Sequence, residues 1–241
     1  GEQDNTFVKV QQFLEEMNIR VPRIYDVNMS RGYILEEDLG DITFLQYLAE
    51  LDNIDKEYEL YENVIDQLLL LHQVKQEQID DSKKFDLKFD FEKLNSEIEF
   101  SIKFFFKLFL KNEDEKVLNE LSDNFVSICE RLAKEKMVLT HRDFHSRNIM
   151  VKDDELIMID FQDARWGIPQ YDLASLLDDC YYQVHPKNKE KLLRYYFDNL
   201  EGSIHNQGSF ENFRSLYVDM AIQRVFKAIG SFSYIYHMRK D

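Results

Sequence analysis

Apolar residues recur at spacings of three and four along most of the chain, which is the pattern of amphipathic helices. The clearest stripes comprise Tyr61, Val64, Ile65, Leu68 and Leu71, and then Val117, Leu121, Phe125, Ile128 and Leu132. Only seven glycines and three prolines interrupt 241 residues, and this scarcity of turn formers favours long helices. Further helices are predicted over residues 6–17, 170–184, 187–200 and 210–236.

Other stretches depart from this pattern. Phe44, Leu45 and Leu48 belong to a helix that Asp41 or Thr43 caps. Residues 104–110 are almost all apolar and are flanked by lysines, so we predict a buried helix with basic edges. The polar residues 80–84 predict a surface loop.

Short β segments occupy two places in the chain. Residues 33–35 predict a strand, which the connector 36–40 follows. Residues 149–151 and 156–159 are apolar runs separated by the turn signal Asp153-Asp154-Glu155. A hairpin centred near Asp154 places Asn148 opposite Asp160, with Cα atoms about 5 Å apart.

The open end of this predicted hairpin brings together ligands that suit a divalent cation. Asn148 offers an amide oxygen and Asp160 a carboxylate, and Mg²⁺ binds such oxygens while it keeps waters and phosphate oxygens. Asp143 lies five residues before Asn148 and adds a second carboxylate. It is placed to accept the proton of a hydroxyl that attacks a phosphoryl group.

The order of these residues matches a kinase catalytic loop. His141-Arg142-Asp143, four residues and Asn148 are followed by Asp160-Phe161. Each piece alone is a weak signal, because a lone His-Arg-Asp is often a surface turn and an Asp after a strand is often a helix cap. Loop, hairpin and second aspartate in this order are a strong signal.

Departures from protein kinases indicate a different family. Gln162 stands where those enzymes have glycine, and the chain runs directly into Gly167-Ile168-Pro169-Gln170-Tyr171-Asp172-Leu173-Ala174. This resembles the aminoglycoside phosphotransferase and choline kinase superfamily. Within it, His-Arg-Asp-Phe-His-Ser-Arg-Asn and Asp-Phe-Gln-Asp-Ala look most like the anomeric kinases for N-acetylmuramate and N-acetylglucosamine.

The resemblance implies an α+β, protein-kinase-like, two-lobed fold. Residues 1–40 would be a remnant of the nucleotide lobe with its hinge, and residues 41–241 a mostly helical lobe. ATP and Mg²⁺ would be used to phosphorylate a small-molecule hydroxyl. The resemblance implies that Asp143 is the catalytic base or hydroxyl orienter and that Asn148 and Asp160 are metal ligands. It also implies nucleotide contacts for Glu36, Glu37 and Leu39. Acceptor contacts are implied for His145, Arg147, Asp163 and Trp166, and structural support for His141 and Asp172.

Simpler interpretations compete for several of these residues. His141 fits a packed structural residue better than a base, and Trp166 equally fits the core. His145 is either a ligand or a satisfied loop histidine, and Arg147 pairs either with a carboxylate or with phosphate. The remaining polar candidates are expected on solvated helix faces: Asp178, Asp179, Gln223 and Arg224.

The nucleotide lobe lacks expected parts. No cluster of glycines that could cover phosphates precedes Gly32, and no strand lysine precedes the first helix. Glu15 and Glu16 lie too near the end of that helix to be assigned the usual partner role. We expect that the first strands are missing from the sequence rather than lost by the protein.

Composition limits the partners. A net charge of −16 repels polyanions and argues against nucleic acid or an anionic membrane as the main partner. Two cysteines, both in apolar helical contexts, do not form a disulfide framework, so the cytoplasm is expected. Three functions remain open: an amino-sugar kinase, a choline- or aminoglycoside-type kinase, and a non-catalytic kinase-like binding protein. The oligomeric state is not predicted.

Overall fold

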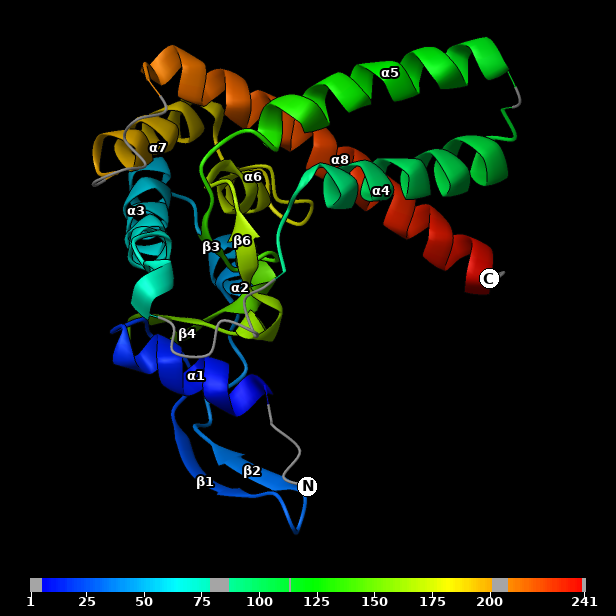
Figure 1. Cartoon of the computed structure of the whole chain (residues 1–241). Coiled ribbons are helices and arrows are strands. Elements are labelled where there is room, and N and C mark those ends of the chain that lie inside the picture. The colour runs from blue at the N-terminus through cyan, green and yellow to red at the C-terminus, as the bar shows by residue number, and fades with distance from the viewer. Residues whose placement is uncertain (1–5, 79–86, 113, 201–207, 240–241) are drawn as a thin grey trace.

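The computed structural model describes residues 6–78, 87–112, 114–200 and 208–239. The surface loop predicted over residues 80–84 lies outside these ranges. Figure 1 shows the arrangement of the elements: a small hairpin and one helix lie at one end, and helices make up most of the rest. None of the described helices has the length and apolar content needed to cross a membrane.

The helices follow the predicted stripes closely. The α-helices of the described chain are α1 (Thr6–Glu16), α2 (Phe44–Ala49), α3 (Ile54–His72), α4 (Phe91–Ser101), α5 (Glu115–Leu132), α6 (Gln170–Leu177), α7 (Pro186–Asp198) and α8 (Phe210–Arg239). Thr43 caps α2, since its hydroxyl accepts from the Gln46 N–H while the Gln46 side chain accepts from the Thr43 N–H. Single-turn 3-10 segments are η1 (Gln76–Gln78), η4 (Ser146–Asn148) and η5 (Phe161–Asp163).

Two helix predictions are corrected. The apolar run is a π-helix, η3 (Ile102–Phe109), and Leu108, Phe109 and Leu110 are exposed rather than buried. Only one side of this helix packs on α8, so a nearly continuous apolar run cannot be buried all round. The helix predicted over residues 170–184 ends at Leu177, and Cys180 is therefore exposed outside a helix, contrary to prediction.

The described residues also contain three short antiparallel strand pairs. β1 (Ile24–Asn28) pairs with β2 (Tyr33–Glu36), β3 (Val138–Thr140) with β6 (Arg165–Gly167), and β4 (Ile149–Lys152) with β5 (Glu155–Met158). The sequence did not predict β6. It lies beside β3 because Trp166 pairs with Leu139 across the ladder.

One buried apolar cluster extends from Val10 in α1 to Phe226 in α8. In Figure 1, α4, α5 and the C-terminal half of α8 project together from the body that contains α3, α6 and α7. The close crossing of α4 and α8 depends on Gly230, because a Cβ there would lie 2.5 Å from the Ser101 Cα. The segment from β3 to β6 crosses the body between these helices and carries the candidate chemistry.

Candidate active site

The β4–β5 hairpin has a register one position away from the predicted one. Ile149 pairs with Met158, so the turn consists of Asp153 and Asp154 alone, and both have positive φ angles of 51° and 63°. Two such residues form the tight turn whose twist matches the strands. The Ile159 N–H donates to the Asn148 carbonyl at 3.0 Å, so Asn148 faces Ile159, not Asp160.

Asn148 and Asp160 nevertheless meet at the open end of the hairpin. The Asn148 Nδ2 donates to the Asp143 carbonyl at 2.9 Å and lies 3.4 Å from the Asp160 Oδ2. Gln162 Nε2 donates to the other carboxylate oxygen at 2.6 Å. Asp160 is exposed and has a left-handed φ of 64°, an uncommon conformation for a non-glycine residue. The Asn148 side-chain amide thus contacts both the backbone carbonyl of Asp143 and the carboxylate of Asp160.

These donors suit Mg²⁺. The Asp160 carboxylate is exposed, and the Asn148 Oδ1 accepts no hydrogen bond from a described residue. Within the described ranges, no group of three or more His, Cys, Asp and Glu side chains could enclose a metal. A carboxylate and an amide oxygen are a sparse protein set, as Mg²⁺ prefers when waters and phosphate oxygens supply its other ligands.

Asp172 holds the backbone that leads into Asp143. Its buried carboxylate accepts from the N–H of His141 at 2.7 Å and from the N–H of Arg142 at 2.9 Å. Arg142 has a φ of 84°, so these bonds maintain a left-handed backbone just before Asp143. His72 Nε2, also buried, lies 3.2 Å from the same carboxylate and connects α3 to the loop.

His141 is a buried loop residue. Its Nε2 donates to the Ile159 carbonyl at 2.9 Å, which joins the loop to the end of β5. Burial lowers the pKa of His141 and outweighs the opposite effect of Asp172, so the ring stays neutral. The neutral ring with its proton on Nε2 leaves Nδ1 as an unprotonated atom without a partner among the described residues.

Positive side chains from α8 and from the neighbouring loop residue Arg142 act on Asp143. Burial by itself raises the pKa of this carboxyl. The charges of Lys227, Arg224 and Arg142 outweigh that effect, and the pKa lies below its ordinary value. Asp143 is therefore an ionised carboxylate at neutral pH, the form that accepts a proton.

Two of these cations come from α8, and the sequence analysis missed both. Arg224, predicted on a solvated surface, donates to the Arg142 carbonyl at 3.0 Å and stacks on the Tyr171 ring with its Cζ 4.3 Å from the centroid. Lys227 follows on the same helical face, three residues later. The available signal was the pair of cations one helical turn apart within the mostly apolar stretch 220–230 of α8. Gln223 is buried as well, and its amide donates to Glu97 at 3.2 Å.

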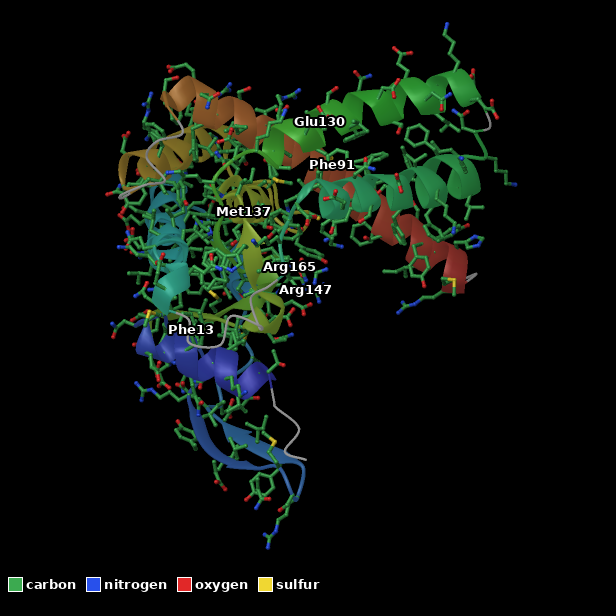
Figure 2. All side chains as sticks on the ribbon, viewed as in Figure 1. Phe13, Phe91, Glu130, Met137, Arg147 and Arg165 are labelled. Atoms are coloured by element: carbon green, nitrogen blue, oxygen red, sulfur yellow. The ribbon has the colours of Figure 1, made fainter. Side chains whose placement is uncertain are left out.

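The residues implied to contact the acceptor do not all gather in one place. His145 and Arg147 both lie against Tyr181. The centroids of the His145 and Tyr181 rings are 5.4 Å apart, and the Arg147 Cζ lies 4.8 Å from the Tyr181 centroid. Asp163 pairs with Arg142 at 2.8 Å. Figure 2 shows Arg147 and Arg165 beside β6, on the side away from α3. Trp166, by contrast, belongs to the buried core, and it forms part of the floor of an open surface pocket that His72 and Met137 also line.

Asp178 and Asp179 were predicted on a solvated helix face, but the structure places both carboxylates in contact with neighbouring segments. Asp179 accepts from both the N–H and the hydroxyl of Ser146, at 2.9 and 2.5 Å, and so fixes the start of η4. Asp178 accepts from the Tyr217 hydroxyl at 2.5 Å and pairs with Lys189. Because α6 ends at Leu177, both carboxylates point into neighbouring segments instead of following a helix face.

The connector Glu36–Leu39 lies against the β4–β5 hairpin. Glu37 pairs with Arg20 at 2.8 Å and with Lys152 at 3.2 Å, and these contacts help to lower its pKa to about 2. Its N–H donates to the Arg23 carbonyl. Leu39 packs in a small buried cluster with Met150 and Ile157. Glu36 is exposed at the end of β2.

Residues 5–203 match the Phosphotransferase enzyme family. The chain belongs to this family. A relative named N-acetylmuramate/N-acetylglucosamine kinase, from Pseudomonas aeruginosa, is 30% identical over 236 residues, which cover 96% of this chain. The chain spans 66% of the length of that relative.

Solved structures with the same fold include an aminoglycoside phosphotransferase and an amicoumacin kinase. The ADP-bound aminoglycoside phosphotransferase APH(2'')-Ib is 21% identical with a TM-score of 0.65, covering 96% of this chain and 74% of that one. Amicoumacin kinase hAmiN is 16% identical with a TM-score of 0.64, covering 98% and 73%. The predicted α+β, protein-kinase-like fold of this phosphotransferase family member is confirmed.

Proposed function

We propose that this chain contains the reaction centre of a kinase that transfers the γ-phosphoryl group of ATP to a hydroxyl of an N-acetylated amino sugar. The observation that carries the proposal is the meeting of Asp143, Asn148 and Asp160 around one amide group. Three residues in this arrangement provide what phosphoryl transfer requires, which is positioning and charge neutralisation. Their joint presence also disfavours a non-catalytic binding protein.

Asn148 and Asp160 would hold Mg²⁺, which supplies charge neutralisation for the phosphate oxygens when it is bound. Asp143 would accept the proton of the acceptor hydroxyl while the acceptor oxygen forms a bond to the γ-phosphorus. The bond from that phosphorus to the β-phosphate oxygen breaks, and ADP leaves. The lowered pKa of Asp143 supports the orienting part of this role, because the carboxylate is ionised and can accept a hydrogen bond from the hydroxyl before transfer.

Glu36, Glu37 and Leu39 would form the connector beside the adenine. Support for this placement comes from Leu39, whose N–H and C=O form no backbone hydrogen bond with a described residue. The Glu37 carboxylate is occupied by Arg20 and Lys152, so it would fix the connector rather than touch the nucleotide. His141 and Asp172 would support the loop through the bonds described above.

The proposed acceptor is inferred from the two amino sugars in the name of the Pseudomonas aeruginosa relative and from the charges near Asp143. Arg142, Arg224 and Lys227 suit hydroxyl or carboxylate oxygens, whereas a cationic aminoglycoside would require convergent carboxylates. His145, Arg147 and Asp163 would contribute contacts from the loop side. Trp166 would act through core packing, because its contacts are with buried residues.

A panel assay tests the proposal. The intact protein is incubated with ATP and Mg²⁺ and, separately, N-acetylmuramate, N-acetylglucosamine, choline and kanamycin, and ADP formation is followed. We expect turnover with at least one amino sugar. Turnover of choline or kanamycin with neither amino sugar would replace the proposal with a choline- or aminoglycoside-type kinase.

A further inference from the structure

We propose that Lys227 is a specificity residue that binds a carboxylate of the acceptor, so that the enzyme prefers acidic over neutral amino sugars. This inference rests on the proposed function and assigns a substrate class to the same site. The acceptor group in question is a carboxylate such as the lactyl group that distinguishes N-acetylmuramate from N-acetylglucosamine.

The geometry of α8 places Lys227 at the site. Arg224 fixes one face of the helix against the loop, through its bond to the Arg142 carbonyl at 3.0 Å and its stacking on Tyr171. Residues three apart in a helix share a face, so Lys227 lies on the face that Arg224 turns toward the loop. The charge interaction between Lys227 and Asp143 is consistent with this position.

The ammonium group of Lys227 is available to a ligand. The residue is half-buried, and it forms no side-chain hydrogen bond or ion pair with any residue in the described ranges. Glu97 of α4, whose charge also acts on Lys227, is already paired with Lys93 at 3.1 Å and bonded to Gln223 at 3.2 Å. A partly desolvated ammonium without a partner is costly, and an anionic ligand would remove that cost.

The position of Lys227 relative to Asp143 favours the acceptor over ATP as the source of the anion. Asp143 is the group proposed to receive the acceptor hydroxyl, and Lys227 lies one turn along α8 from Arg224, which bonds to the carbonyl of the residue just before Asp143. A sugar whose hydroxyl lies at Asp143 can extend its carboxylate toward α8. The metal and phosphates are assigned to Asn148 and Asp160, at the end of the hairpin.

The test compares Lys227→Met and Lys227→Arg with the wild type. For each protein, kcat/KM is measured with N-acetylmuramate and with N-acetylglucosamine, and the ratio of the two values is the readout. Losing a charged hydrogen bond to the carboxylate should lower the acidic-to-neutral ratio about 10- to 100-fold in Lys227→Met. Lys227→Arg should keep most of the ratio. Lys134→Met, at an exposed lysine after α5, is the matched control and should leave the ratio unchanged.

If Lys227→Met lowered kcat/KM by the same factor for both sugars, the inference would be overturned, because Lys227 would then act on Asp143 or on the phosphates. Calorimetric titration with each sugar in the presence of ADP and Mg²⁺ provides a readout without turnover. If the wild type phosphorylates neither sugar, the proposed function fails. The inference about Lys227 fails separately if Lys227→Met binds N-acetylmuramate as tightly as the wild type does.

Discussion

Asp143 illustrates how a single residue obtains its properties from distant parts of the chain. Partial burial by itself would raise the pKa of its carboxyl, and Lys227 and Arg224 of α8, together with the neighbouring Arg142, supply the positive charges that reverse this shift. We predict that Asp143→Asn lowers kcat about 10²- to 10⁴-fold, as expected when a general base is lost. The affinity for ATP and Mg²⁺ should remain nearly unchanged, which calorimetry can measure.

The matched control for this substitution is Asp154→Asn. Asp154 is exposed in the hairpin turn with a positive φ, a conformation that asparagine tolerates well. Its turnover should equal that of the wild type. Near-native turnover of Asp143→Asn at saturating substrates would show that Asp143 is not the acceptor-facing residue.

At the scale of elements, Glu37 connects three segments that are distant in sequence. It accepts from Arg20 after α1, from Lys152 in β4 and from the Arg23 N–H, while its own N–H bonds back to Arg23. We predict that Glu37→Gln lowers the free energy of unfolding at pH 7 by about 1–3 kcal/mol, the usual effect of losing hydrogen bonds to a charged group. Urea unfolding measures the loss.

The same contacts make the contribution of Glu37 to the free energy of unfolding dependent on pH. The pKa of Glu37 falls from an ordinary 4.5 to about 2 in the folded protein, so its contribution is complete above pH 4.5 and disappears as the pH falls toward 2. The difference in unfolding free energy between wild type and Glu37→Gln should shrink over that interval. Glu36→Gln, at an exposed neighbour, should show no such trend, and a constant difference for Glu37→Gln would contradict the assignment.

The close crossing of α4 and α8 at Gly230 predicts how a larger residue at that position would change stability. Replacing glycine by alanine within a helix normally stabilises it by about 1 kcal/mol. At Gly230 the new Cβ would lie 2.2 Å from the Ser101 Oγ and 2.5 Å from its Cα, so the helices would have to separate. We predict that Gly230→Ala destabilises the protein by about 1–3 kcal/mol in urea. Ser231→Ala, one residue later in α8, should change stability by less than about 0.5 kcal/mol.

At the scale of the whole molecule, the core that extends from α1 to α8 includes Phe144, Ile149 and Phe161, the chain neighbours of Asp143, Asn148 and Asp160, so ligand binding and global unfolding are coupled. We predict that ATP with Mg²⁺, at 100 times its dissociation constant, stabilises the folded protein by about 2.7 kcal/mol. Calorimetry should show the corresponding rise in Tm. EDTA should remove the part of the rise in Tm that depends on Mg²⁺, and Asp160→Asn should make that part smaller. A rise in Tm that persists in EDTA would argue against the metal assignment.

The sequence by itself determined the elements and the local part of the site. Helical periodicity predicted most helices, and two apolar runs around a turn predicted the hairpin that unites Asn148 and Asp160. These features depend on interactions between residues close in sequence, which spacing records directly. The loop from His141 to Asn148 was identified for the same reason, although the hairpin register was wrong by one position because three turn residues were assigned where two suffice.

Only the tertiary structure decided which distant side chains complete the site. Arg224 and Lys227 reach Asp143 because α8 packs on α6 and Arg224 bonds to the loop, and no spacing in the sequence encodes that approach across about 80 residues. The family resemblance implied an acceptor contact for Trp166 while its residue type also fitted the core, and it is the pairing of β6 with β3 that buries this side chain. Burial and pKa depend on the summed surroundings of a group, and those surroundings exist only after the helices have packed.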